Sequence, residues 1–594
     1  VALPQARAEI ASIVADVERT HPATNREVQV QRLNDEVVGS VRTPIYVLLG
    51  AVLFVLAIAC ANVAHMLLAR SAQRRREIAV RTALGASRGR TIRQLLTESL
   101  VLALAGGAGG VLIAFAGVRF IAALGASSIP RLAGASVDGR VLLAALVAAG
   151  LTALAFGLAP ALRATSLDLS RSLKEGGRGT GEGGGRGRFR RILIASEFAL
   201  ALMLLVGAGL MVRTFSALST HDTGFDPHNV LSAIVSVEGT AEAGGSTRGA
   251  FYQQVLEQTR SVPGVVSASM INHLPIAGDE GGFSFWVEGR PVPRRGDELT
   301  GVYRVTMPGY FKTMRLPLAR GRDFTDGDRD GAPGVVIVNE NVAEKVWPGQ
   351  DPIGKRITLD RPDSAPQWLT VVGESRNAAV DQIDDRGDLE LYVPYAQQDV
   401  GPAASGIFTY MTLVLRVACA RPDDRCNAGR AAPRMRAGIA SIDPHVPVTS
   451  IQTMDGVVAS ATARDRFYLV LMSVFAAVAL VLATVGIYGV TSYAVSRRTH
   501  EIGLRIALGA SPAALLRDVI GEGMAMAFVG AAVGLVGSLA LTRLLADVLY
   551  GVSAHDPITF AAAALVLSVV ALGATYVPAR RATRVAPLAA LRGD

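Results

Sequence analysis

Arg75-Arg-Glu-Ile-Ala-Val-Arg-Thr-Ala-Leu-Gly-Ala-Ser87 decides the fold, because the chain contains this stretch twice. The second copy is Thr499-His-Glu-Ile-Gly-Leu-Arg-Ile-Ala-Leu-Gly-Ala-Ser511, and Glu77 corresponds to Glu501 at a constant offset (501 − 77 = 424). One long apolar run precedes each copy and two more follow it. Such a repeat indicates two copies of one membrane unit.

Each copy is typical of a helix, a break and a second helix at a membrane surface. Gly85 and Gly509 suit a helix end that needs a left-handed residue. Ser87 and Ser511 suit the N-cap of the next helix, with Pro512 at its first position. One copy alone is equally consistent with a basic loop held by lipid head groups. Two copies that match in charge, break and cap favour a docking surface for a cytoplasmic partner.

The composition is that of a membrane protein. The 594 residues are 50% hydrophobic and 18% charged, with a mean hydropathy of +0.36. The net charge of +9 does not indicate nucleic-acid binding, because the arginines cluster beside apolar runs without interleaved aromatic residues. This pattern is typical of charges that determine membrane topology.

Seven apolar stretches are long enough to cross a bilayer, which requires about 20 residues in a helix. They predict an α-helical polytopic membrane protein with about seven transmembrane helices: Ile45–Leu68, Leu100–Ile121, Val141–Leu162, Ile192–Val212, Phe467–Tyr493, Met524–Leu544 and Ile558–Val577. Many of these stretches are rich in Gly and Ala, which lets helices approach closely in lipid.

The charges of the loops predict the orientation. The segments 70–93, 163–191, 497–517 and 580–592 are strongly basic and are expected in the cytoplasm. The N-terminus is then outside, the C-terminus is cytoplasmic, and residues 214–466 form one large extracytoplasmic α/β domain. Short β-type runs between residues 301 and 394 predict a β-rich insertion in this domain.

The predicted domain organisation follows the repeat. Asp35-Glu-Val-Val-Gly-Ser40 resembles Asp455-Gly-Val-Val-Ala-Ser460, and each lies just before an apolar run. We therefore expect the chain to begin inside a repeat, without a first span and most of a first outer domain. The predicted parts are the end of that domain (1–42), a first three-helix permease unit (43–165), a Gly-rich basic linker (166–191), a span (192–213), the outer domain (214–466) and a second three-helix unit (467–594).

The sequence contains only weak signals for a disulfide, a metal site or functional polar residues within the membrane. Cys419 and Cys426 could form a disulfide if their region is extracytoplasmic, and the alternative of two thiols stays open. The segments 221–228 and 326–330 superficially resemble metal sites, but turns are favoured, so no metal is expected. Glu197 lies early in a span, where acids are functional candidates. The nearby Arg190 and Arg191 favour pairing or snorkelling, and Asn62 and His65 receive a similar interpretation.

The residues resemble a known family. A large outer domain between one span and three more, with Glu-Ile-Gly-Leu-Arg-Ile-Ala-Leu-Gly-Ala after the second span, looks like the MacB/FtsX-like permeases of ABC transporters. Gly309-Tyr-Phe-Lys-Thr-Met-Arg-Leu-Pro-Leu-Ala-Arg-Gly-Arg-Asp-Phe324 resembles the periplasmic core domain of that family. The doubled form with a basic linker resembles the duplicated acidobacterial-type orphan permeases.

The resemblance implies a place in the bacterial inner membrane and a separate cytoplasmic ATPase as partner. The residues that it places at or near the ATPase contact are Glu77, Arg81, Gly85, Glu501, Arg505 and Gly509. The sequence contains no Gly-x-x-x-x-Gly-Lys-Ser/Thr phosphate loop, so we expect neither enzyme activity nor a cofactor on this chain, with ATP bound by the separate subunit. Pairing of the two units within the chain and pairing with a second permease chain both stay open.

Two functions from different classes are consistent with these residues. The first is a permease subunit of an ABC-type export or mechanotransmission system. The alternative is a non-transporting membrane scaffold or sensor whose outer domain binds a ligand or an envelope partner. An ion-coupled carrier is disfavoured, because such carriers place charges or broken helices near the midplane.

Overall fold

The computed structural model divides into two compact units, which are described separately below. One comprises residues 1–37 and 218–462 (the α/β unit), and the other comprises residues 38–217 and 463–594 (the helical unit). The structure describes residues 3–20, 30, 32–73, 88–125, 137–147, 150, 184–238, 240, 245–278, 281–294, 297–363, 366–380, 383, 386–398, 409–419, 426–497, 504–506, 508 and 511–583.

The α/β unit contains one mixed sheet of eleven strands in two parts. The first part has the strand order β11 (Val448–Thr453), β1 (Val230–Ser236), β10 (Tyr410–Val417) and β2 (Val265–Ile271), all antiparallel. Two helices, α8 (Gly245–Arg260) and α11 (Ala432–Ile442), pack on it. The residue pattern of the sequence predicts strands at Val230–Val237, Val265–Met270 and Met411–Val417 and helices at Thr247–Arg260 and Arg430–Ile442. The structure confirms these five elements with bounds shifted by up to two residues.

Six further strands close into a ring: β4 (Leu299–Thr306), β3 (Gly282–Val287), β7 (Arg356–Thr358), β8 (Leu369–Ser375), β6 (Val335–Asn339) and β9 (Glu390–Pro394). The parallel pairing of β4 with β9 completes the closure, with Arg304 opposite Tyr392. The edge strand β5 (Leu318–Gly321) pairs with β8. The β-rich part therefore begins at β3, earlier than the predicted residue 301.

Further helices complete the description of the α/β unit. They are α1 (Leu3–Thr20), α9 (Tyr310–Met314), α10 (Glu340–Val346), α12 (Met454–Ala461), and the 3-10 turns η4 (Tyr395–Gln397) and η6 (Ala428–Ala431). Asn339 caps α10 by accepting a hydrogen bond from the backbone N–H of Val342. Met454 and Val457 of α12 pack in an apolar cluster with Phe225 and Val230, so α12 is anchored beside the first strand.

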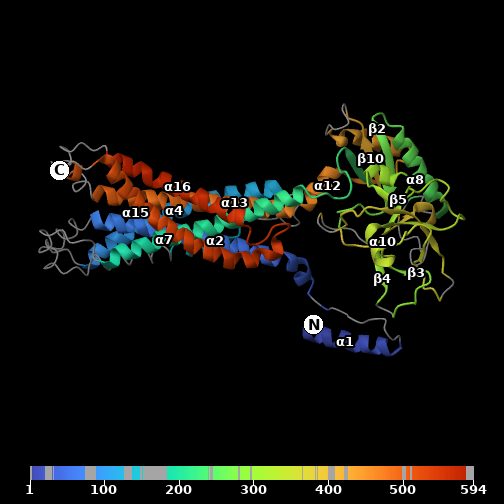
Figure 1. Cartoon of the computed structure of the whole chain (residues 1–594), viewed down its shortest axis with the longest axis horizontal. Coiled ribbons are helices and arrows are strands. Elements are labelled where there is room, and N and C mark those ends of the chain that lie inside the picture. Colours follow the sequence, from blue (N-terminus) through green and yellow to red (C-terminus); the bar gives the residue numbers. More distant parts are fainter. Residues whose placement is uncertain are drawn as a thin grey trace. The chain divides into compact units, whose positions relative to one another are not determined.

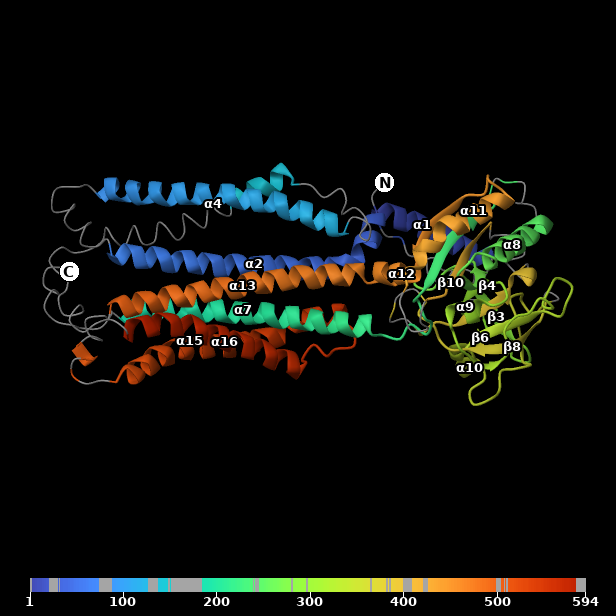
Figure 2. The same ribbon diagram turned by 90° about the horizontal axis from the view of Figure 1, so that it is seen from above.

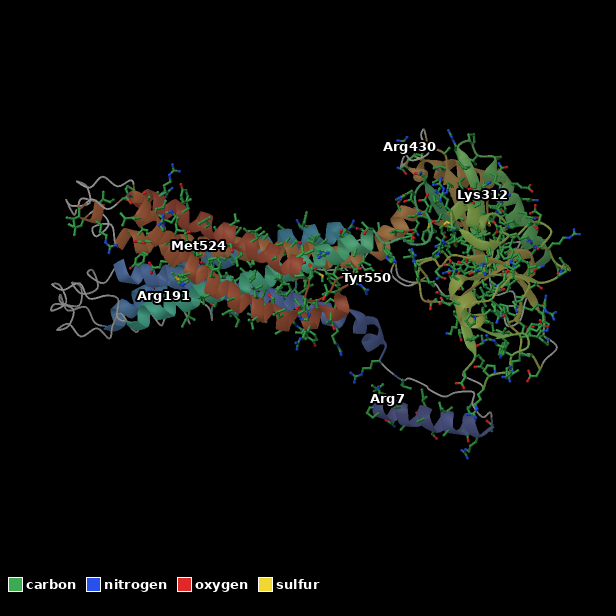
Figure 3. The ribbon with its side chains drawn as sticks, viewed as in Figure 1. Arg7, Arg191, Lys312, Arg430, Met524 and Tyr550 are labelled. Atoms are coloured by element: carbon green, nitrogen blue, oxygen red, sulfur yellow. A yellow bond between two sulfur atoms is a disulfide. The ribbon has the colours of Figure 1, made fainter. Side chains whose placement is uncertain are left out.

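The helical unit contains long helices that run along one common direction in both views (Figures 1 and 2). They are α2 (Leu33–Gln73), α4 (Arg88–Gly125), α7 (Gly184–Ser219), α13 (Ala463–Arg497), α15 (Pro512–Leu541) and α16 (Pro557–Thr583), with the 3-10 turn η7 (Thr542–Val548) after α15. Arg191 and Met524 are labelled toward one end of these helices and Tyr550 toward the other (Figure 3).

Five helices in the described part of the chain are long and apolar enough to cross a membrane: Arg42–Met66, Arg191–Ser219, Ala463–Ser496, Pro512–Ala546 and Pro557–Arg581. They coincide with five of the seven predicted spans. The predicted count of about seven is not established, because the apolar part of α4 is a shorter stretch, Leu104–Phe120. Most of the remaining predicted span, Val141–Leu162, lies outside the described residues.

Small residues bring α15 and α7 into backbone contact. A Cβ atom added at Gly530 would lie 2.6 Å from the carbonyl oxygen of Ala195, and one at Gly534 would lie 2.8 Å from that of Ala199. From the first contact to the second, the chain advances by four residues, about one turn, on both helices. The two helices therefore run parallel. The predicted role of Gly in close helix packing is thus met at these positions.

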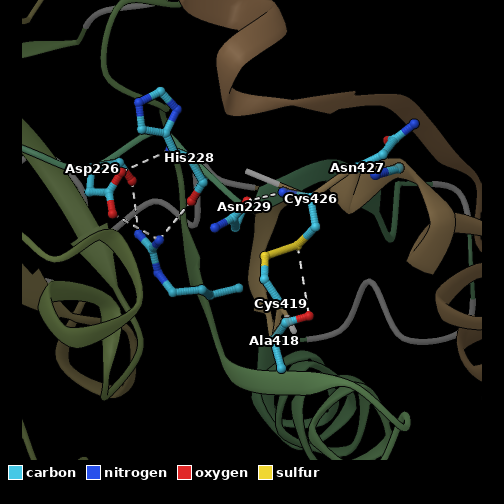
Figure 4. The surroundings of a disulfide bond; sticks show 9 residues. Asp226, His228, Asn229, Ala418, Cys419, Cys426 and Asn427 are labelled. Atoms are coloured by element: carbon cyan, nitrogen blue, oxygen red, sulfur yellow. Dashed lines mark hydrogen bonds and ion pairs between the residues drawn. A yellow bond between two sulfur atoms is a disulfide. The ribbon is translucent and has the colours of Figure 1, made fainter. Parts of the chain in front are cut away.

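A disulfide joins Cys419 to Cys426 in the α/β unit, with their Cα atoms 5.8 Å apart (Figure 4). The bridge lies beside the start of β1, because the backbone N–H of Cys426 donates to the side chain of Asn229 at 2.8 Å. The backbone N–H of Val417 in turn donates to the carbonyl of Asn229 at 2.9 Å. These two hydrogen bonds fasten the segment after β10 to the segment before β1, and the bridge closes the loop of residues 419–426 beside them.

We expect the Cys419→Ser/Cys426→Ser double variant to lose about 2 kcal/mol of unfolding free energy, because a short closed loop restricts the unfolded chain. Urea unfolding of the full chain in detergent, read by tryptophan fluorescence, measures this loss. The readout is specific, since all three tryptophans (Trp286, Trp347 and Trp368) belong to the α/β unit. Reduction of the unaltered chain should shift the midpoint equally, and an unchanged midpoint in both cases would contradict the prediction.

Candidate functional site

The second copy of the repeated segment joins α13 to α15. Residues 504–506 are helical, and the N–H of Leu508 donates to the carbonyl of Leu504 at 3.0 Å. Ile506 packs with Val495 of α13 against Leu515 of α15, which is buried. This apolar contact connects the described part of the segment directly to both helices.

The start of α15 is built as the sequence predicts. The side chain of Ser511 accepts a hydrogen bond from the N–H of Ala514 at 3.3 Å, and Pro512 occupies the first helical position. Next to this cap, Leu504 is 46% exposed and Leu508 is 79% exposed. Two apolar side chains are therefore exposed in the described part of the repeated segment.

The predicted contact residues can be placed only in part. Arg505 is exposed between Leu504 and Ile506. The other five, Glu77, Arg81, Gly85, Glu501 and Gly509, lie outside the described residues. Their role at an ATPase contact therefore stays a prediction.

A polar cluster lies inside the helical unit, where α2, α7 and α13 meet. Glu197 of α7 is fully buried, and its Oε1 lies 3.3 Å from Nδ1 of His65 on α2. Asn62, one turn before His65, donates from its side chain to the carbonyl of Leu482 on α13 at 2.9 Å. A Cβ atom added at Gly486 would lie 2.7 Å from Oδ1 of Asn62 and closer still to Oε2 of Glu197.

This cluster corrects the sequence-based interpretation of Glu197. Pairing or snorkelling toward Arg190 and Arg191 was expected, but Glu197 faces His65 instead. Arg191 lies 3.9 Å from Glu522 of α15. Asn62 and His65 likewise face the interior rather than lipid, with 6% and 8% exposure.

Family models match most of the chain. A MacB-like periplasmic core domain matches residues 196–424, and an FtsX-like permease C-terminal domain matches residues 49–169 and again residues 473–587. The chain belongs to the MacB/FtsX-like family of ABC transporter permeases. The double match coincides with the repeat, and the core domain of this permease is its extracytoplasmic part.

Curated relatives of this permease are exporters. It is 27% identical over 281 residues to the pyoverdine export ATP-binding/permease protein PvdT of Pseudomonas syringae pv. tomato, covering 47% of this chain and 40% of the relative. It is 22% identical over 302 residues to the macrolide export ATP-binding/permease protein MacB of Wolinella succinogenes, covering 50% and 44%. The permease thus spans less than half the length of these relatives.

Solved structures of outer domains are similar to part of this permease. The periplasmic region of MacB from Actinobacillus actinomycetemcomitans is 15% identical, with a TM-score of 0.27, and the match covers 39% of this chain and 92% of that one. The extracellular domain of the transporter YknZ from Gram-positive bacteria is also 15% identical, with a TM-score of 0.24, covering 37% and 100%.

At the end of the helical unit that lies opposite the repeated segment, an ion pair fixes the start of α16. Asp556 accepts from the backbone N–H of Thr559 at 2.9 Å and from its hydroxyl at 2.6 Å, and lies 2.5 Å from the guanidinium of Arg213 on α7. These hydrogen bonds, with the Arg213 charge, hold the pKa of Asp556 at about 2, below its usual range. The N-cap of α16 is thereby tied to α7.

In the α/β unit, the segments 221–228 and 326–330 are turns held by ion pairs. Arg416 donates to Asp226 Oδ2 at 3.2 Å and to the carbonyl of His228 at 2.7 Å (Figure 4). His228 Nδ1 lies 2.6 Å from Asp455 at the start of α12. Asp328 is engaged by Arg322 at 2.7 Å. Among the described residues, no group of His, Cys, Asp and Glu side chains is arranged to hold a metal ion.

Proposed function

We propose that this permease is the membrane subunit of an ABC-type export or mechanotransmission system. In this proposal, a separate cytoplasmic ATPase docks on the repeated segments, and its closure moves the extracytoplasmic domain. The observation that carries the proposal is the contact of Ile506 with Val495 and Leu515, beside the exposed Leu504 and Leu508. A partner that pushes on this segment would act directly on α13 and α15.

Helix α13 is the element suited to transmit this movement. It is one continuous helix of 35 residues, and Thr462 alone separates it from α12 in the chain. Because α12 is anchored in the apolar cluster beside β1, a displacement of α13 would pass to α12 through the backbone that joins them. A continuous helix is stiff along its axis, which favours this route.

The names of the relatives support export as the class of function. PvdT and MacB are named ATP-binding/permease proteins, so in those relatives permease and ATP-binding functions belong to one protein. The 594 residues of this chain contain no phosphate loop, so in this proposal ATP is bound outside them. The orientation that the proposal requires puts residues 497–517 in the cytoplasm.

Co-purification in detergent with candidate ATPase subunits tests this proposal. We expect the unaltered chain to bind its ATPase and to change the rate of ATP hydrolysis. We expect the Glu77→Lys/Glu501→Lys double variant to lose binding, because it reverses one charge in each copy of the docking segment. The matched control is Glu238→Lys/Glu257→Lys, which reverses two exposed charges in the α/β unit and should bind normally.

Two results would decide against the proposal. Equal binding by the unaltered chain and the Glu77→Lys/Glu501→Lys variant would remove the repeated segments from the contact. Failure of the unaltered chain to bind any candidate ATPase, while its domain captures an envelope ligand, would establish the scaffold or sensor function instead.

A further inference from the structure

Two residues at equivalent positions of the repeat touch each other inside the helical unit. Asn62 and Gly486 are separated by the offset of the repeat (486 − 62 = 424), and the side chain of Asn62 packs on Gly486. The carbonyl that accepts from Asn62 belongs to Leu482, which is the equivalent of Ile58 (482 − 424 = 58). Ile58 is fully buried in the same apolar cluster.

Contact between equivalent residues is the mark of a two-fold axis. In a two-fold symmetric pair, a residue near the axis meets its own copy, and every other contact occurs twice. Helices α4 and α15 obey the same offset, since Arg88 at the start of α4 corresponds to Pro512 (512 − 88 = 424). An approximate two-fold axis near Asn62 and Gly486, relating the two permease copies, would account for this contact.

The residues along α2 have the spacing of a helix–helix seam. Positions separated alternately by four and three residues face a parallel partner helix. On α2 these are Ala51, Val55, Ile58 and Asn62, and their copies on α13 are Phe475, Ala479, Leu482 and Gly486. The apolar members of both sets belong to one cluster.

The two sides of this seam are not interchangeable. The α2 side carries the polar Asn62 where the α13 side carries Gly486, and Glu197 of α7, which faces His65, fills the space beside Gly486. Two α13 helices would present glycine to glycine, without the hydrogen bond from Asn62. Two α2 helices would bring an asparagine side chain onto another where the observed packing requires the absence of a Cβ atom. One polar residue at such a position specifies the partner.

We propose that α2 and α13 form a keyed seam, so that the first permease copy takes the second copy of the same chain as its partner. Asn62, His65 and Glu197 supply the polar side chains of this seam, and the missing side chain at Gly486 leaves room for Asn62 and Glu197. A second copy of this chain is excluded from the seam. The seam concerns the pairing of the permease copies and does not depend on the proposed ATPase contact.

Disulfide cross-linking of the full chain tests the seam. In a Cys60→Ser background, the equivalent pair Ile58→Cys/Leu482→Cys places one thiol on each helix, one turn from Asn62, and leaves the key intact. A protease site inserted within residues 176–183 separates the two helices into different fragments. We expect one cross-linked chain of monomer mass whose fragments stay joined after cleavage and separate on reduction.

Controls and a second pair keep the test decisive. Leu53→Cys/Val481→Cys places thiols on exposed positions, at 53% and 61% exposure, and should not cross-link. Val55→Cys/Ala479→Cys is another equivalent pair, available if the first variant does not fold. Adding Gly486→Ala should reduce the cross-link, whereas Gly489→Ala, which meets no atom within 4 Å, should leave it unchanged.

Two outcomes would overturn the seam. The first is a cross-linked product of twice the chain mass. If cleavage of this product releases the two fragments that carry no cross-link, the contact forms between two chains. Cross-linking of both seam pairs no greater than that of the exposed control would show that α2 and α13 do not face each other along these residues.

Discussion

Glu390→Ala is expected to destabilise the α/β unit by about 3–5 kcal/mol, because it leaves the guanidinium of Arg304 buried without its counter-charge. Both side chains are almost completely buried, at 1% and 0% exposure, and Arg304 Nε lies 2.6 Å from Glu390 Oε1. Arg304 also donates to the carbonyl of His273 at 2.9 Å. The pair lies on β4 and β9, whose parallel pairing closes the six-stranded ring.

The surroundings explain the size of this effect. Tyr310 and Tyr392 are also buried beside the pair, and burial raises the pKa of both phenols. In such an apolar site, neither water nor the neutral phenols can replace the carboxylate. Arg304→Met/Glu390→Leu, which removes both charges with similar volume, is expected to recover most of the lost stability.

Urea unfolding of the full chain, followed by tryptophan fluorescence, measures both variants. The control is Glu288→Ala, which breaks the exposed ion pair of Glu288 with Arg356 and should shift the midpoint far less. A Glu390→Ala midpoint equal to that of the Glu288→Ala control would show that the buried pair is not what holds the ring closed.

Gly486→Ala is the second large effect, and it concerns the helical unit. The added methyl would collide with Asn62 Oδ1 and Glu197 Oε2, so these two side chains, or the helices that carry them, must shift. Overpacking of this kind costs about 1–3 kcal/mol, and loss of the hydrogen bond from Asn62 to Leu482 adds to it. The same change at Gly489, three residues along α13, meets no atom within 4 Å and replaces a poor helix former by a good one.

Cys60 provides a reporter for this comparison. It is the third cysteine of the chain, it lies on α2 two residues before Asn62, and it is half-buried outside the disulfide. Thermal unfolding in detergent, followed with a thiol-reactive fluorophore, therefore reports on the helical unit. We expect Gly486→Ala to lower the midpoint by several degrees and Gly489→Ala to leave it unchanged or raise it. Equal midpoints for the two variants would contradict close packing at Gly486.

The sequence is sufficient to predict features that depend on local order. Apolar length predicts α7, α13 and α16, and the motif Ser511-Pro512 predicts the start of α15. The strands β1, β2 and β10 are predicted by short runs of β-type residues. These features need only neighbouring residues, so the surrounding fold does not alter them.

The polar cluster could not be predicted in this way. Arg191 and Glu197 are six residues apart, which places them about 240° apart around a helix, on different faces. Arg190 is seven residues from Glu197, so it shares the face of Glu197 but lies two turns, about 10 Å, away along the axis. Closeness in the sequence was therefore a poor guide to the partner of Glu197. The actual partner, His65, lies on another helix, and only the packing of α2 against α7 brings it close. One signal was present: Asn62 and His65 are three residues apart in an apolar run, which places them on one face.

The contact of Asn62 with Gly486 bears on how a duplicated gene can change. In a homodimer, every mutation on the axis enters both subunits at once, so the surface must remain complementary to itself. Joining both copies in one polypeptide lifts that restriction, because each position on the axis can now mutate alone. An asparagine on one side and a glycine on the other is a pair that identical subunits cannot encode. Covalent duplication therefore permits pairs of different residues across the axis, which a symmetric homodimer cannot have.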